Sequence, residues 1–129
     1  MIKIFEKDGK INFVDDENTL VGFDYHQSCC EDFGWFMTKE EPTTINIDTK
    51  DKIDHENLDL SEYLSEYLFD KGYFKMDSVT GYDQHNYVLF RLKKNEEVIY
   101  LMLYNCHNGY YGHGFNMDIG GKTIYSNVL

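Results

Sequence analysis

Short apolar runs alternate with turn-forming residues along most of the chain, which is typical of a sheet-rich protein. Residues 2–5 and 11–14 flank Asp8-Gly9, a dipeptide that supplies the positive φ angles of a tight hairpin turn. We therefore predict a β-hairpin there. The other predicted strands are residues 20–25, 35–38, 43–47, 73–79, 87–92, 98–104, 115–119 and 122–128.

Two of these segments carry more specific information. Residues 98–104 are apolar at nearly every position, which predicts a central strand that is covered on both faces. The last two segments flank Gly120-Gly121, a second two-residue hairpin signal.

One stretch has the periodicity of a helix instead. Its apolar residues recur at three-four spacing, as expected for an amphipathic helix with one buried stripe. Asp59 and Glu62 resemble a capping box, and Gly72 a C-terminal stop. These features predict a main helix at about residues 59–70, with an apolar stripe of Leu60, Tyr63, Leu64, Tyr67 and Leu68.

Together these elements predict an α+β fold. It consists of a mostly antiparallel, twisted sheet of about six to eight strands that packs against the one helix. The 129 residues are enough for one core, and neither a linker nor an internal repeat divides them. We expect a single domain over residues 1–129.

The composition is typical of a folded chain, and it also indicates the cellular compartment. Aromatic residues make up 16% of the sequence, including eleven Tyr, and a disordered chain would have few. No segment approaches the roughly 20 apolar residues of a membrane span, and the N-terminal residues lack a signal-peptide stretch. Three cysteines, two of them adjacent, make a poor disulfide framework. We expect a cytoplasmic protein with reduced thiols and no membrane partner.

Charge narrows the possible partners. Twelve basic and 23 acidic residues give a formal net charge of −11. Such a chain repels phosphate backbones, so we do not expect nucleic acid as a ligand. A basic protein is the partner that this charge favours.

The first motif that could carry chemistry contains Cys29, Cys30 and Glu31. Adjacent side chains on an extended backbone point to opposite faces, so one thiol can be buried while the other faces a groove. The simplest interpretation is structural thiols. A metal ligand and a redox or vicinal-disulfide role are the alternatives.

The second motif is the string from Cys106 to His113, with Asn108, Gly109, Tyr110 and Tyr111 at its centre. Asn and Gly tolerate the left-handed conformation, so this string predicts a tight turn with aromatic packing. The functional alternative is that its backbone N–H groups and Tyr hydroxyls contact a ligand.

The two motifs together contain the side chains that could bind zinc or make bonds. Tetrahedral zinc sites use sulfur and imidazole ligands. A thiol paired with a histidine, such as Cys29 with His26 or Cys106 with His113, could act as a nucleophile. Neither the usual metal-ligand spacing nor a complete catalytic set is present, so we predict no catalytic residue. The candidate zinc ligands are His26, Cys30, Cys106, His107 and His113.

The joint order of these features resembles a family of small uncharacterised phage and bacterial proteins, a domain of unknown function. The shared features are Cys29-Cys30-Glu31, a Leu-rich acidic segment at residues 58–68, apolar strands within residues 87–104, and Asn108 to Tyr111. The resemblance covers roughly residues 20–119 and implies a compact α+β domain without a known mechanism.

These observations favour a non-enzymatic protein-binding module, such as a phage- or bacterium-encoded inhibitor or immunity-type factor. The alternative is a metal- or thiol-dependent site, of hydrolytic type, where the two motifs meet. The site candidates are Cys29, Cys30, Glu31, Asn108, Gly109, Tyr110 and Tyr111.

Overall fold

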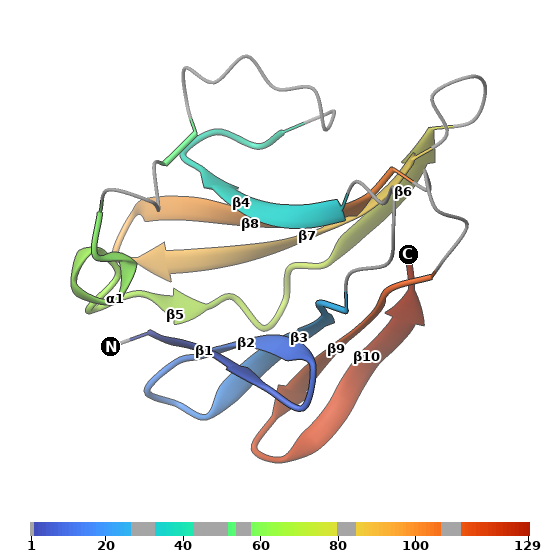
Figure 1. The fold of residues 1–129 in the computed structure, drawn as a ribbon. Helices are drawn as coiled ribbons and strands as arrows, with labels where there is room; N and C mark the ends of the chain where they lie inside the picture. Colours follow the sequence, from blue (N-terminus) through green and yellow to red (C-terminus); the bar gives the residue numbers. More distant parts are fainter. Residues whose placement is uncertain (1, 27–32, 43–51, 54–57, 80–84, 107–111) are drawn as a thin grey trace.

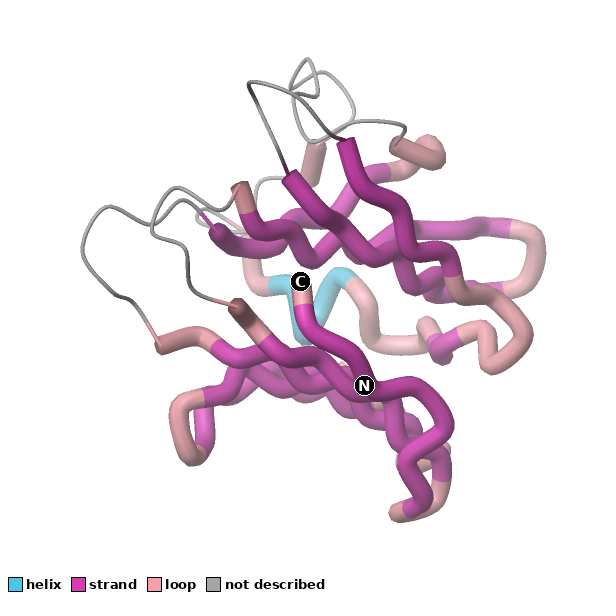
Figure 2. The backbone as a smooth tube through the Cα atoms, turned by 90° about the vertical axis from the view of Figure 1, so that its right-hand side faces the viewer, coloured by secondary structure: helices cyan, strands magenta, loops and turns pink. Residues whose placement is uncertain are grey.

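Two antiparallel sheets pack face to face in this protein. The structure is a computed structural model, and it describes residues 2–26, 33–42, 52–53, 58–79, 85–106 and 112–129. Figure 1 shows the strands in sequence colours, with the short helix at one end of the sheets, and Figure 2 shows the sheets as two separate layers. Each sheet has five strands in the described part of the chain.

The first sheet joins the beginning of the sequence to its end. Its strand order is β1-β2-β3-β9-β10. The central pairing is between β3 and β9, where Thr19 lies opposite Ile119. The strands are β1 (Lys3–Lys7), β2 (Lys10–Val14), β3 (Thr19–Asp24), β9 (Gly114–Ile119) and β10 (Lys122–Val128).

The second sheet is built from the middle of the sequence. Its order is β4-β8-β7-β5, and β6 also pairs with β7. The long β7–β8 hairpin forms its centre. The strands are β4 (Phe33–Thr38), β5 (Leu68–Phe69), β6 (Lys75–Val79), β7 (His85–Lys94) and β8 (Glu97–Asn105).

The two hairpins predicted from glycine-containing turns are confirmed. Asp8 and Gly9 have φ angles of 54° and 75°, and they connect β1 to β2. Gly120 and Gly121 have φ angles of 58° and 85°, and they connect β9 to β10. Two successive positive φ angles match the twist of the flanking strands, so the turn residues alone predicted these connections.

The prediction of a central strand is also confirmed. β8 lies between β4 and β7, and its residues are buried on both faces. Leu101 and Leu103 belong to the core between the sheets, whereas Met102 belongs to a second cluster on the opposite face. Apolar side chains on both faces of β8 are therefore buried as the sequence predicts.

Aromatic side chains fill much of the space between the sheets. Phe90 of β7 and Phe115 of β9 come from different sheets, and their ring centroids lie 6.2 Å apart with the rings edge to face. Phe74 packs edge to face on Phe90 and stacks on Tyr125 of β10 at 4.1 Å. Edge-to-face and stacked pairs of this kind add to the stabilisation from burial.

The predicted helix at residues 59–70 is wrong beyond its first turn. Asp59 does cap a helix, since its carboxylate accepts hydrogen bonds from Ser61 and Glu62, but α1 spans only Leu60–Tyr63. Leu68 and Phe69 form β5 instead and pair with Lys93 and Leu92 of β7. Gly72 does not end a helix but donates to Asp70 in the turn that follows β5.

The predicted α+β class is wrong for the same reason. A short helix depends on tertiary packing, and here the alternative pairing with β7 satisfies backbone groups that the helix would have used. The described residues form a nearly all-β sandwich of ten strands, more than the six to eight expected. No helix among them is long and apolar enough to span a membrane. The predicted strand at 43–47 lies outside the described residues.

A buried carboxylate connects the two sheets. Asp15, in the turn between β2 and β3, is only 5% exposed. Its Oδ1 accepts hydrogen bonds from the backbone N–H groups of Glu17 and Thr19, both at 2.9 Å. Its Oδ2 accepts one from the N–H of Phe69 at 2.9 Å. One side chain therefore shapes a turn of the first sheet and holds β5 of the second.

Candidate functional site

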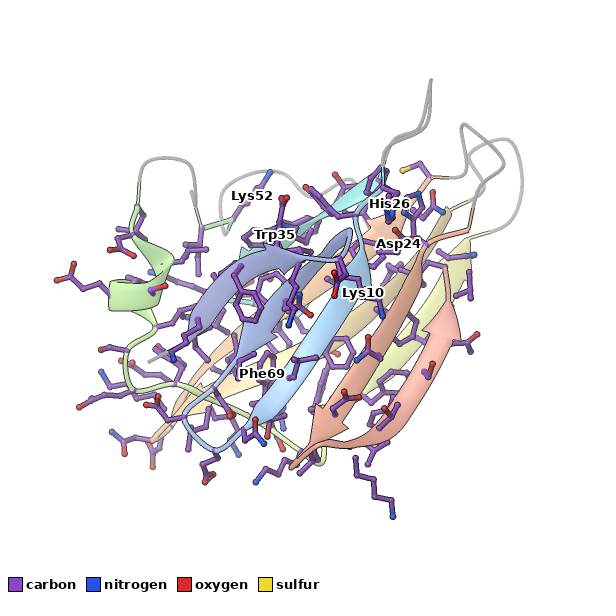
Figure 3. All side chains as sticks on the ribbon, turned by 60° about the horizontal axis from the view of Figure 1, so that its bottom comes forward. Lys10, Asp24, His26, Trp35, Lys52 and Phe69 are labelled. Carbon is purple, nitrogen blue, oxygen red and sulfur yellow. The ribbon has the colours of Figure 1, made fainter. Side chains whose placement is uncertain are left out.

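The end of β3 carries an exposed aspartate–histidine pair. The Nδ1–H of His26 donates to Oδ1 of Asp24 at 2.9 Å, and the backbone N–H of His26 donates to the same oxygen at 3.0 Å. Figure 3 shows both side chains at this end of the sandwich, near Lys10. Burial by itself raises the pKa of Asp24, but the hydrogen bonds from His26 outweigh it, so that pKa lies below its ordinary value.

The His26 ring lies directly over the β1–β2 turn. A Cβ atom at Gly9 would overlap the ring, and the φ of +75° at Gly9 also disfavours any other residue. The carbonyl of Gly9 accepts a hydrogen bond from the N–H of Tyr25 at 2.8 Å. The turn and the Asp24–His26 pair therefore hold each other in place.

His113 lies in the same region but is buried. It is 1% exposed, and its ring stacks on Phe33 with centroids 3.8 Å apart. Its Nδ1 lies 2.9 Å from the carbonyl oxygen of Asp24. A carbonyl only accepts, so Nδ1 carries the proton. His113 thus joins the end of β3 to the beginning of β9 and β4.

Cys106 is half-buried and directly follows β8. The other predicted site residues, namely Cys29, Cys30, Glu31, His107, Asn108, Gly109, Tyr110 and Tyr111, lie outside the described residues. Within the described ranges, no three histidine, cysteine or acidic side chains are grouped as a metal site. The prediction of a zinc or thiol site therefore stays a prediction.

A different group of side chains lies on the outer face of the second sheet. Phe36, Met102 and Leu89 face one another across β4, β8 and β7, and all three are buried although they point away from the main core. The next row along the sheet contains Tyr104 and Tyr87, and the row on the other side contains Tyr100. An apolar centre is thus bordered by tyrosines.

We call Tyr73, Tyr87, Tyr100 and Tyr104 the tyrosine face. Tyr73 packs edge to face on Tyr100 with centroids 5.6 Å apart. Tyr73 and Tyr104 are half-buried, and the other two are buried. The Tyr104 hydroxyl reaches over Gly34, where a Cβ atom would come within 2.9 Å of it. Gly34 therefore allows the Tyr104 side chain to lie flat on the sheet.

Carboxylates accept hydrogen bonds from two of these hydroxyl groups. The Tyr73 hydroxyl donates to Oε1 of Glu41 at 2.6 Å, and the Tyr87 hydroxyl donates to Oδ2 of Asp77 at 3.4 Å. Burial and these carboxylates raise the pKa of both tyrosines. Both hydroxyls therefore remain protonated donors at neutral pH.

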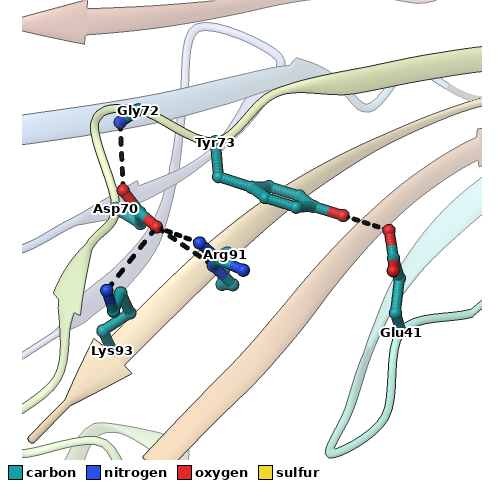
Figure 4. Close-up of polar contacts among 6 residues, drawn as sticks. All are labelled: Glu41, Asp70, Gly72, Tyr73, Arg91 and Lys93. Atoms are coloured by element: carbon teal, nitrogen blue, oxygen red, sulfur yellow. Dashed lines mark hydrogen bonds and ion pairs between the residues drawn. The ribbon is translucent and has the colours of Figure 1, made fainter. Parts of the chain in front are cut away.

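A guanidinium also lies on this face (Figure 4). The Arg91 Cζ atom is 4.5 Å from the centroid of the Tyr73 ring, and its Nε and Nη2 donate to Oδ2 of Asp70 at 3.0 and 2.6 Å. Asp70 also accepts a hydrogen bond from the N–H of Gly72 at 3.0 Å. Burial by itself raises the pKa of Asp70. The hydrogen bonds from Arg91 and Gly72 and the charge of Lys93 outweigh this effect, and the pKa of Asp70 is therefore lower than its ordinary value.

We expect Asp70→Asn to lower the free energy of unfolding by about 2 kcal/mol at neutral pH. The pKa of Asp70 is lower in the folded state than in the unfolded state, where it is about 3.9. The contribution of Asp70 to the free energy of unfolding is therefore complete above a pH of about 3.9, and it is lost as the pH falls through the pKa of the folded state. Urea unfolding of the variant and of the wild type at several pH values measures this difference, which should shrink in acid. Asp8→Asn, at an exposed turn, is the control, and a pH-independent difference for Asp70→Asn would contradict the explanation.

Sequence reasoning did not identify the tyrosine face. The signal was present in residues 98–104, where Tyr100, Met102 and Tyr104 alternate with core residues. This alternation places two tyrosines on the face opposite the core. Their neighbours on β4 and β7 could not be assigned without the strand register.

The geometry defines a β-sandwich with an exposed Asp–His pair at one end and a tyrosine face on one sheet. A family model described as a domain of unknown function, DUF7448, matches residues 1–117, and the chain belongs to this family. The predicted resemblance to a family of uncharacterised proteins is confirmed at this level. Neither a curated protein nor a solved structure matches the chain.

Proposed function

We propose that this protein is a non-enzymatic binding module that holds a basic segment of another protein at the border of its tyrosine face, where Tyr73 and Tyr104 are half-buried and Glu41 is exposed. The observation that carries the proposal is the Tyr73–Glu41 hydrogen bond of 2.6 Å, which fixes a carboxylate at the border of an aromatic surface. A lysine or arginine side chain can pack its apolar stem on such rings while its charged end meets the carboxylate.

The face already accommodates cations of this chain in that manner. Arg91 lies over the Tyr73 ring, and the Lys75 Nζ lies 3.7 Å from Oε1 of Glu41. Lys52 lies 5.7 Å from the centroid of the Phe36 ring. Cation–π contacts and charge-assisted hydrogen bonds are thus compatible with the local geometry. A partner's side chains would extend the same pattern.

Composition and charge support the same kind of partner. Tyrosine and arginine are enriched at protein–protein interfaces because they combine large contact areas with polar ends. The net charge of −11 would increase the rate at which a basic protein is encountered. A role as a phage- or bacterium-encoded inhibitor or immunity-type factor fits a small acidic module of this type.

The test measures binding to purified basic proteins that the wild type captures from a bacterial lysate. Calorimetry at low and at high salt should show a steep loss of affinity with salt for the wild type. The variant Glu41→Gln/Asp77→Asn keeps the size of both side chains and should lose about tenfold in affinity, or ~1.4 kcal/mol.

The matched control is Glu6→Gln/Asp8→Asn, which removes the same charge from exposed positions on the first sheet. This control should retain most of the affinity. Equal losses in both variants would mean that only net charge matters, and this result would overturn the assignment to the tyrosine face. Failure to recover a basic partner, or binding that is insensitive to salt, would overturn the function itself.

A further inference from the structure

The two edge strands of the first sheet differ sharply in charge. β1 carries Lys3, Glu6 and Lys7 among its five residues. β10 carries a charge only at Lys122, its first residue, and the following stretch from Thr123 to Leu129 is uncharged. Proteins commonly protect sheet edges with charged side chains, because an unprotected edge pairs with other strands. β1 has this protection and β10 does not.

β10 also exposes apolar side chains. Six of its seven residues are exposed, and Val128 and Ile124 are 58% and 40% exposed. Tyr125 packs toward the core against Phe74, so strand alternation places Ser126 and Val128 on the opposite, outer face. Ile124 lies at the register shift between Thr123 and Tyr125 and is exposed there. An edge with exposed β-branched residues is well suited to pair with another strand.

The backbone geometry identifies the groups that face outward. Leu129 exchanges both backbone hydrogen bonds with His113, at 2.8 and 3.1 Å. Such pairs alternate along an antiparallel ladder, so the N–H and C=O groups of Ser126 and Val128 point away from β9. The Val128 N–H is bonded to Oδ1 of Asn127 at 2.8 Å. The outward groups of Ser126 are therefore the natural centre of a new pairing.

We propose that a second copy of this chain pairs antiparallel along β10, centred on Ser126, to form a continuous ten-stranded sheet. In this register Ser126 lies opposite Ser126 of the partner. Val128 of each copy then lies beside Ile124 of the other, so the exposed apolar residues of the two copies meet twice. Ile124 is the residue at the register shift of β10 between Thr123 and Tyr125, so it marks the end of the regular pairing.

A second copy fits this edge for two reasons. The register is self-complementary, as a two-fold interface requires. This stretch also brings two chains of charge −11 together at a place where neither has a charged side chain. Met76, which is 37% exposed and bonded through sulfur to Asn127, adds apolar surface beside the same edge.

Cysteine cross-linking tests the register directly. Ser126→Cys would place two thiols at a hydrogen-bonded cross-strand pair, with Cα atoms about 5.5 Å apart, which is within disulfide range. Lys122→Cys is the control, since its two copies would be about 27 Å apart along the strands. In both variants Cys29, Cys30 and Cys106 are replaced by serine or, if that protein does not fold, retained. The expected result is that Ser126→Cys oxidises rapidly to a covalent dimer, whereas Lys122→Cys forms little dimer.

Sedimentation measures the dimer without a cross-link. The wild type should dimerise as its concentration rises, and Ile124→Lys/Val128→Lys should remain monomeric with unchanged circular dichroism. Phe5→Lys alters a residue of similar exposure on β1 and should dimerise like the wild type. A monomeric wild type at high concentration, or equal cross-linking of both cysteine variants, would overturn the proposal.

Discussion

Replacing Asp15 with alanine is expected to lower the free energy of unfolding by about 4 kcal/mol, enough to unfold much of a marginally stable domain. The substitution removes the acceptor of three backbone N–H groups, those of Glu17, Thr19 and Phe69. Asp15 and Thr19 are buried, so water cannot fully replace these bonds. Urea unfolding followed by the fluorescence of the single tryptophan, Trp35, measures the effect.

Asp15→Asn separates the charge from the shape of this side chain. An amide oxygen can still accept from Glu17 and Thr19, but the amide nitrogen would then face the N–H of Phe69. We expect about half the loss seen for alanine. A neutral effect of both substitutions would mean that the carboxylate does not connect the sheets in solution.

Replacing Phe90 with alanine is expected to cost a similar amount, about 3–5 kcal/mol. Phe90 is fully buried and contacts Phe74 and Phe115 edge to face. The cavity would open between the two sheets, where neither sheet can close it alone. Thermal and urea unfolding of the variant measure the loss, and Phe5→Ala, at an exposed position, provides the control.

A double-mutant cycle with Phe115→Ala tests the contact between the sheets. The two rings touch, so the double variant should lose less stability than the sum of the single variants. Additive losses would show that each ring is stabilised mainly by its own sheet. That result would contradict the explanation of Phe90 as a residue that joins the two layers.

The sequence predicted the parts of the fold that depend on neighbouring residues. Asp8-Gly9 and Gly120-Gly121 require positive φ angles, and this requirement is a property of the turn itself. Residues 98–104 are apolar on both faces, which only a central strand tolerates, and β8 is one. These predictions needed no knowledge of distant parts of the chain.

The predicted helix was wrong because contacts with distant residues determine the structure of this segment. Asp59 begins a helix as expected, but the pairing of Leu68 with Lys93 and the bond from Phe69 to Asp15 place the end of the segment in a sheet. Periodicity correctly identified Leu60, Leu64 and Tyr67 as buried, but Tyr63 of the same predicted stripe is exposed. Periodicity did not identify the partners that bury the other residues.

The candidate site was predictable only in part. Two of its proposed residues, His26 and His113, both contact Asp24, one through its carboxylate and the other through its carbonyl. Asp24 itself was missed, because an aspartate at the end of a strand has no distinctive pattern. The tyrosine face was missed because it joins β4, β7 and β8 with Tyr73, and only the register brings them together.

The pairing of β3 with β9 has a consequence for the way the chain acquires its structure. Thr19 cannot meet Ile119 until one hundred further residues have emerged from the ribosome, although the β1–β2–β3 meander can form much earlier. Until then β3 is itself an open edge. Contacts between such distant segments slow folding to the millisecond-to-second range. The early meander is thus the part of the nascent chain that would benefit most from a chaperone.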